Sequence, residues 1–477
     1  MRAVRIETSP FQILSLVEFE SILKKNQHGC AKISGYISAE EKNRIMAMIS
    51  EETWAHIWFY DETGGKNILF CGYIEDLRIH AEADTFLLTV LLKTGTGKMD
   101  MGEHIGVYQN AATSYQKILE TIVQGYTDGK LLMGTEAGNI GKMVVQYKET
   151  DWEFAKRLAA QKNTVLMANE KSAGVKYTFG IIEEAGRELL SYESYSIVNL
   201  IGEYQIKKNC GMTESDAVAY KVKTREIFYL GDAVCFLGKN YVVGEVERKW
   251  EGNEIYNYYL LETKGELRQM PYGNKKIIGA SLKGNVTSVK KDTVKVVLME
   301  DETGGWAGQK WFAYSTIYSS PDGTGWYCMP EKGDSVRLYF PNENEAEAYV
   351  NSSVNEQSSD SSARSNPDEK SIKNKQGKEV LFQPDRLILT NNNGMSVKII
   401  DDEGIIIESD KSITIRAKEN IGIISMEQGV EMSAPEKIAF QQGNTMLELA
   451  DDINVQGGRV KKATKNLAFL QIGRAHV

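Results

Sequence analysis

The sequence predicts a mainly β protein with a few helices, whose last third assembles with copies of itself. Short alternating apolar segments bounded by polar or Gly-rich turns fill most of the chain. After Gly404, apolar residues recur in pairs about every eight or nine positions. The two members of a pair lie two positions apart, so both side chains fall on one face of a strand. The pairs are Ile405/Ile407, Ile413/Ile415, Ile421/Ile423, Val430/Met432, Ile438/Phe440, Leu447/Leu449 and Ile453/Val455.

These strands are too short and too one-sided to bury their apolar face within one sheet. Stacked units of this period close a core by adding neighbouring copies, and here those copies come from other chains. We therefore expect residues 379–460 to form a narrow prism of intertwined chains. The expected interior residues of this needle are Ile413, Ile415, Ile421, Ile423, Val430, Met432, Ile438 and Phe440.

Composition excludes several classes of protein. The 477 residues are enough for two to four domains, and the net charge of −9 disfavours nucleic-acid binding. Met1–Pro10 lacks a signal-peptide core, and no apolar run reaches the roughly 18–20 residues that span a bilayer. The five cysteines show no C-x-x-C spacing and the histidines no metal-ligand spacing. We expect a protein made in the cytoplasm, without cofactor or metal.

Residues 1–265 combine strands with two helices. Residues 56–60 and 67–71 flank a turn-rich stretch and predict a hairpin, and residues 86–92 predict a buried strand. Apolar spacing changes to i, i+3, i+4 at 114–126 and again at about 150–162, which indicates amphipathic helices. Further strands are expected at 227–230, 234–237, 241–244 and 256–261.

A second module and a linker follow. Residues 276–350 contain short strands with Gly-rich turns, as in a compact all-β domain. Residues 351–378 are rich in Ser, Asn and charge, which predicts a flexible linker. The linker is too short for an enzyme domain, given a lower limit of about 50 residues.

The segment Gly323–Asn342 resembles the oligonucleotide/oligosaccharide-binding (OB-fold) barrel of contractile-tail spike proteins. In this reading Trp326 fills the barrel end, while Val336, Leu338 and Phe340 alternate inward. The residues that carry the resemblance are Trp326, Pro330, Gly333, Asp334, Phe340, Pro341 and Asn342.

The segment 145–154 looks like the hub portion of the VgrG family. Its matching residues are Gln146, Tyr147, Glu149, Thr150, Asp151 and Phe154. The resemblance implies that residues 1–265 form two tube-like barrel units and that the stalk of residues 379–460 is a triple-stranded β-helix. The order of hub, barrel, linker and prism covers nearly all of residues 1–470. The strict Val-Gly repeat of some family members is absent from this stalk.

The resemblance implies a homotrimeric spike and hub of a contractile injection machine, such as a phage tail or a type VI secretion system. Its partners would be the tail tube protein, baseplate components, a conical PAAR-like tip protein, secreted effectors and the target cell envelope, with no nucleic acid. Such a protein is ejected toward that envelope. The alternative is a trimeric tail fibre or adhesin, and a cell-wall hydrolase is a distant third.

The sequence contains only weak matches to catalytic and ligand-binding motifs. Ser114-x-x-Lys117 lies at a helix start without companion motifs, so no catalytic residue is predicted. The carboxylates of Asp61/Glu62 and Asp301/Glu302 are expected at solvated hairpin tips. Trp306, Trp311, Trp326 and Tyr327 fit packing better than base or sugar stacking, because basic residues are not concentrated among them.

The last seven residues, 471–477, match one reading frame of a common sequencing adapter. We expect them to be foreign to the natural protein.

Overall fold

The computed structural model describes residues 5–50, 52–60, 64–304, 308–356 and 364–458. The segment 471–477 lies outside the described residues. The chain is mainly β, with 44% strand and 13% helix, as the sequence predicts. It divides into two units, residues 1–358 and 359–477, which are described separately.

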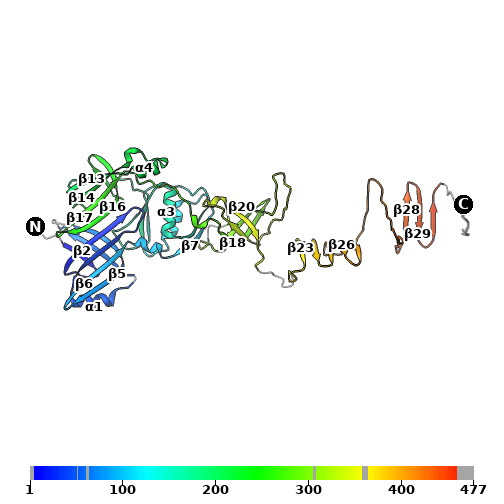
Figure 1. The fold of residues 1–477 in the computed structure, drawn as a ribbon, viewed down its shortest axis with the longest axis horizontal. Coiled ribbons are helices and arrows are strands. Elements are labelled where there is room, and N and C mark those ends of the chain that lie inside the picture. Colours follow the sequence, from blue (N-terminus) through cyan, green and yellow to red (C-terminus); the bar gives the residue numbers. More distant parts are fainter. Residues whose placement is uncertain (1–4, 51, 61–63, 305–307, 357–363, 459–477) are drawn as a thin grey trace. The chain divides into compact units, whose positions relative to one another are not determined.

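The first unit is built on a twelve-stranded sheet made of two sets of strands (Figure 1). The first set is β1 (Arg5–Ser9), β2 (Ser15–Lys24), β3 (Cys30–Ile37), β4 (Trp54–Tyr60), β5 (Lys66–Glu82) and β6 (Thr85–Lys93). The second set is β12 (Arg187–Glu188), β13 (Ser194–Asn199), β14 (Val218–Thr224), β15 (Ala233–Phe236), β16 (Lys239–Glu251) and β17 (Glu254–Glu262). The strand order is β1-β4-β5-β6-β3-β2-β16-β17-β14-β13, with β15 pairing β16 and β12.

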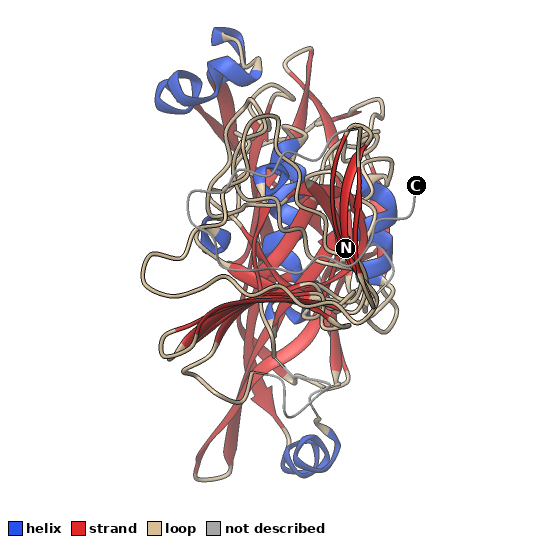
Figure 2. Ribbon diagram, turned by 90° about the vertical axis from the view of Figure 1, so that its right-hand side faces the viewer, coloured by secondary structure: helices blue, strands red, loops and turns tan. Residues whose placement is uncertain are grey.

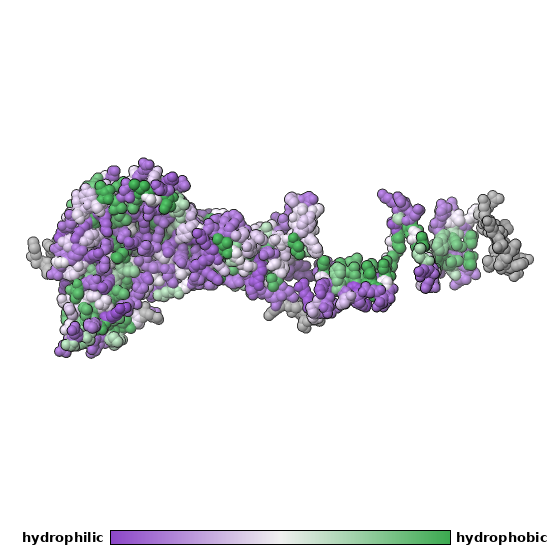
Figure 3. Space-filling model, viewed as in Figure 1, coloured by the Kyte–Doolittle hydropathy of each residue, from purple (hydrophilic) through white to green (hydrophobic). Residues whose placement is uncertain are grey.

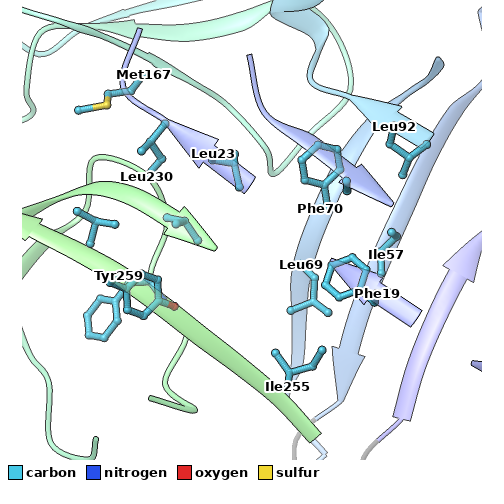
Figure 4. Packing of buried hydrophobic residues seen from close by; sticks show 14 of the residues in the cluster. Phe19, Leu23, Ile57, Leu69, Phe70, Leu92, Met167, Leu230, Ile255 and Tyr259 are labelled. Atoms are coloured by element: carbon cyan, nitrogen blue, oxygen red, sulfur yellow. The ribbon is translucent and has the colours of Figure 1, made fainter. Parts of the chain in front are cut away.

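Antiparallel pairing of β2 with β16 joins the two sets, with a register from Glu20↔Lys249 to Lys24↔Glu245. Phe19 of β2, Phe70 of β5 and Tyr259 of β17 are fully buried in one apolar cluster. Figure 4 shows residues of both sets gathered in this cluster. The two sets of strands thus share one sheet and one core.

Most strand predictions in this region are confirmed. Strands β4 and β5 form the predicted hairpin, and β6 alternates buried and half-buried residues. The segment 227–230 is not a strand, contrary to expectation. Phe228 is buried in the core, and its N–H donates to the Tyr259 hydroxyl at 2.8 Å instead of to a neighbouring strand.

A helical layer packs beside the sheet, and both predicted helices are confirmed as α2 (Tyr115–Val123) and α3 (Asp151–Gln161). Thr150 caps α3 in a capping box with Glu153, and Ser114 caps α2. The small strands of this layer are β8 (Lys130–Met133), β10 (Leu166–Ala168) and β11 (Lys176–Phe179), and the ribbon beside it is β7 (Glu103–Tyr108) with β9 (Val144–Thr150). Two further helices, α1 (Ala39–Met48) and α4 (Ile201–Lys207), were not predicted.

A five-stranded barrel completes the first unit. Its strands are β18 (Ser281–Lys290), β19 (Thr293–Leu298), β20 (Trp311–Ala313), β21 (Ser335–Tyr339) and β22 (Tyr349–Ser353). The sheet order is β20-β19-β18-β21-β22, and a parallel bridge between Tyr314 and Val350 brings its two ends together. This is the closed Greek-key order of an OB-fold. Val336, Leu338 and Phe340 are buried inside it, as their alternation predicts.

The ribbon of β7 and β9 connects the helical layer to the barrel. Val107 and Val145 belong to the barrel core, whereas Tyr108 and Val144 belong to the helical core. Adjacent residues of a strand face opposite sides, so each strand of the ribbon contributes to both cores. The ribbon is therefore the shared wall between the two.

A buried ion network centred on Arg157 of α3 fastens this wall. The guanidinium binds both oxygens of Glu149 at 2.8 and 2.7 Å and one oxygen of Glu345 at 2.8 Å. It also donates to the Val145 carbonyl at 2.7 Å, and Arg157 is 0% exposed. Burial disfavours the charge, but the bonds to Glu149 and Glu345 outweigh it and raise the pKa of Arg157.

The second unit contains two antiparallel sheets. The first is a meander of β23 (Lys370–Lys373), β24 (Glu379–Gln383), β25 (Arg386–Thr390), β26 (Met395–Ile400) and β27 (Gly404–Ser409). The second is a meander of β28 (Ile438–Gln442), β29 (Thr445–Leu449) and β30 (Ile453–Gln456). Strand β23 lies within the segment 351–378 that was expected to be linker, as does most of β22.

We predict that Arg157→Met destabilises the first unit by about 3–5 kcal/mol, because it leaves the Glu149 and Glu345 carboxylates buried without their cation. Chemical denaturation followed by tryptophan fluorescence measures the change. Arg78→Met is the matched control: Arg78 is 79% exposed and pairs with Asp76 at the surface, so its loss should cost under about 1 kcal/mol. Equal effects of the two substitutions would contradict the role given to Arg157.

Candidate assembly surfaces

One face of the five-stranded sheet in the second unit is almost wholly apolar. The register aligns two rows of directly opposed residues across it. One row is Ile372, Val380, Leu389, Val397 and Ile407, and the other is Lys370, Phe382, Leu387, Ile399 and Ile405. Figure 3 shows a continuous green surface along this sheet, with purple, hydrophilic residues below it.

The three-stranded sheet repeats this arrangement. Ile438, Leu449 and Ile453 are directly opposed, and so are Phe440, Leu447 and Val455. All six side chains therefore share one face, which confirms the strand pairing predicted from their spacing. The opposite face carries Ala439, Glu448 and Asn454 in one row and Gln441, Met446 and Gln456 in the other.

The segment 411–437 between the two sheets differs from expectation. The pairs Ile413/Ile415, Ile421/Ile423 and Val430/Met432 were predicted on strands, but the described chain forms no strand there. All six side chains are at least half exposed. The i, i+2 spacing can give a strand one apolar face, but a strand also needs a neighbouring strand to pair with. Within the described part of the chain, the segment 411–437 pairs with no strand.

These surfaces are costly to leave in water. Ile405 and Ile407 are 70% and 60% exposed, and Phe440 is 50% exposed. Burying one large apolar side chain is worth about 1.5–3 kcal/mol. Contiguous apolar patches of this kind mark interaction sites in folded proteins.

The residues of the barrel motif lie at its turns and in its core. Pro330 and Phe340 are buried, and Asp334 accepts the Glu331 N–H at 2.7 Å to close the turn that contains Gly333. Asn342, which follows Pro341, donates to Glu347 at 2.7 Å. Trp326 is 49% exposed and does not fill the barrel end as expected, because it lies in a loop outside the strands. Phe312 of β20 is one of the residues that occupy the core instead.

The hub motif forms a buried polar cluster around the start of α3. Gln146 donates to Asp151 at 2.9 Å, and the Tyr126 hydroxyl donates to the other Asp151 oxygen at 2.6 Å. Thr150 caps the helix and Phe154 is fully buried. Tyr147 packs against the barrel core, where its carbonyl accepts a bond from Asn274 at 2.8 Å.

Two partners of this motif, Arg157 and Glu345, were not predicted. Arg157 lies eight residues after Glu149, and Glu345 lies 188 residues after Arg157. Their charges alone gave no signal, because buried and exposed charged residues look alike in a sequence.

Two carboxylates expected at a solvated hairpin tip bind the ribbon instead. Asp301 accepts the Val107 N–H at 3.1 Å, and Glu302 accepts the Ile105 N–H at 3.2 Å and contacts His104 at 2.9 Å. They satisfy backbone donors on the edge of β7. Asp61 and Glu62 lie outside the described residues, as does Trp306, while Trp311 is 39% exposed.

Catalytic and metal features do not emerge from the described part of the chain. Ser114 accepts the Lys117 N–H at 3.1 Å, so the Ser-x-x-Lys match is a helix cap. Among the described residues, no group of three or more His, Cys, Asp or Glu could hold a metal ion. None of the described helices is long and apolar enough to cross a membrane.

Comparison with known proteins gives matches in structure alone. No protein-family model matches the chain, and no curated protein matches it in sequence. The chain is similar to the c3393 protein of E. coli, with a TM-score of 0.50, 14% identity, and coverage of 73% of this chain and 99% of that one. That protein is described as a component of the type VI secretion system that resembles the T4 bacteriophage tail proteins gp27 and gp5.

A second structural match is the Francisella PdpA-VgrG complex in its half-lidded form. The TM-score is 0.52 at 9% identity, and the match covers 85% of this chain and 87% of that one. The lidded form of the complex matches with a TM-score of 0.53. The structural neighbours of this chain are thus VgrG-like proteins of type VI secretion and tail proteins, and the chain has their fold.

Proposed function

We propose that the protein is the homotrimeric hub and spike of a contractile injection machine. The hub of residues 1–265 adapts a hexameric tail tube to a threefold point. The barrel at 276–350 is a collar, and residues 379–460 form the needle. The fold shared with VgrG-like proteins supports this assignment.

The observation that carries the proposal is the exposed apolar surface of the second unit. Two sheets each present one apolar face, and the segment between them exposes six more predicted interior residues. Three copies around an axis bury these faces against one another. In that assembly the segment 411–437 gains, from neighbouring chains, the strand partners that it lacks alone.

The function of such a needle is mechanical. Contraction of the sheath supplies work, and the needle concentrates it on a small area of the target envelope. Interchain apolar burial resists buckling, since every layer contributes large side chains from three chains. The end of the needle receives a conical tip protein, and secreted effectors travel with the spike.

The second candidate, a trimeric fibre or adhesin, accounts for the needle but gives no function to the hub. The first unit contains a twelve-stranded sheet, a helical layer and a barrel joined by buried contacts. These elements fit a tube adaptor better than the head of a fibre.

We predict that Ile413→Asp with Ile415→Asp prevents formation of the trimer, because the needle would bury like charges from three chains in each layer. Size exclusion with light scattering measures the mass. The matched control is Ser412→Asp with Thr414→Asp, whose side chains alternate with the isoleucines and face outward in the needle. If the variant with both isoleucines replaced forms a trimer as stable as that of the control, the isoleucines do not face the interior of the needle.

A genetic experiment separates the two candidates. Deleting the gene in the strain that carries it should abolish assembled tube-and-sheath particles in electron micrographs, since tube growth starts from the hub. Loss of a fibre would leave such particles intact and impair only their attachment. Reintroducing the unmodified gene is the control, and normal particle numbers in the deletion strain would overturn the hub assignment.

A further inference from the structure

Two helices of the first unit are only weakly buried by their own chain. Helices α2 and α3 bury four and eight residues, whereas α1 buries two and α4 buries one. A surface helix normally turns an apolar stripe toward the core and exposes its polar face. Helices α1 and α4 depart from this rule.

Helix α4 reverses the usual burial pattern, because it buries a lysine and exposes isoleucines. Lys207 is its one buried residue, and its ammonium donates to the Glu266 carbonyl at 2.9 Å and contacts the Glu266 carboxylate at 3.2 Å. Burial raises the pKa of Glu266 to about 7, although Lys207 opposes the shift. Ile201 and Ile206 of α4 are 56% and 62% exposed, and Ile197 of the preceding β13 is also exposed. We call these three isoleucines the α4 patch.

Helix α1 presents a second apolar surface. Its buried residues are Glu41 and Ile45, while Met46 is 73% exposed. Leu14 and Tyr36, which are joined by a backbone bond of 2.8 Å close to the start of the helix, are exposed as well. We call Met46, Leu14 and Tyr36 the α1 patch. Methionine side chains adapt their shape to a partner surface.

The two patches lie at opposite ends of the unit. Helix α4 is at the top and α1 at the bottom in Figure 1, and Figure 2, which keeps the same vertical axis, places them the same way. The exposed charges beside them are complementary: Lys208 follows α4, whereas Glu40 lies in the first turn of α1 and Glu52 follows that helix. The other charges of the helices are engaged within the chain, since Arg44 pairs with Glu41, Glu203 with Lys207, and Lys42 lies over Phe86.

We propose that the α4 patch of one subunit docks on the α1 patch of the next, and that this contact closes the hub ring. The proposal rests on the homotrimer proposed above. A ring forms when two different surfaces of one chain bind head to tail and the rotation closes after a fixed number of copies. Surfaces at opposite ends of a chain suit this geometry, whereas a two-fold contact would use a single self-complementary patch.

Cross-linking between engineered cysteines tests the contact. The background replaces the four native cysteines that are not buried, as Cys30→Ser, Cys210→Ser, Cys235→Ser and Cys328→Ser. Three variants are made in it: Ile206→Cys, Met46→Cys, and both together in one chain. Each is confirmed as a trimer by light scattering and then treated with a flexible bis-maleimide.

We expect the double variant to migrate mainly as a covalent trimer on a denaturing gel, and each single variant to stay monomeric. A mixture of the two single variants, assembled together, should yield a covalent dimer. The matched control combines Met46→Cys with Ile317→Cys, a residue 91% exposed on a barrel loop, and should give no cross-linked trimer.

The outcomes separate this proposal from the proposed function. If the protein is a trimer but the double variant does not cross-link, or if Ile206→Cys cross-links alone, the α4–α1 contact is wrong and the hub and spike assignment stands. If the unmodified protein is a monomer, both fail.

Discussion

The apolar faces of the second unit are the constraint on which the rest of the account depends. A single chain folds residues 370–409 and 438–456 into single sheets, and a single sheet cannot bury its own apolar face without another element packed on it. The register places two rows of large apolar side chains on one face of each sheet. Without a partner, that surface would promote aggregation, so assembly is built into the pattern of the strands.

The first unit joins three apolar cores. The ribbon of β7 and β9 contributes side chains to the helical core and to the barrel core at once. Arg157 then ties the ribbon, α3 and the barrel residue Glu345 with short buried bonds. A polar network of this kind specifies one arrangement, because any displacement leaves a buried charge unpaired. The family-like hub motif is therefore best understood as the structural joint between the helical layer and the barrel.

Helices and strands were predictable from the sequence where the residues that define them lie close together in the chain. The apolar spacing at about 150–162 predicted α3, and the pairs Ile438/Phe440 and Leu447/Leu449 predicted one face of a strand each. The same spacing at Val380/Phe382 and Leu387/Leu389 was present but was not read as strands β24 and β25. Helix α1 also had a signal, since Ser38 caps it by accepting the Glu41 N–H.

Features that depend on distant partners were not predictable. Helix α4 could not be predicted from apolar spacing, because its buried residue is Lys207 and its exposed residues include Ile201 and Ile206. Arg157 and Glu345 meet only after the barrel has packed on the ribbon. The strands expected at 413–432 require neighbours that one chain does not contain. In each case the missing information lies in tertiary or quaternary contacts rather than in the local sequence.

The absolute mass of the purified full-length protein, measured by light scattering after size exclusion, tests the central claim most directly. The account predicts a particle of three times the mass of one chain that persists on dilution. A well-folded monomer would contradict it, because the apolar faces of the second unit would then remain in water.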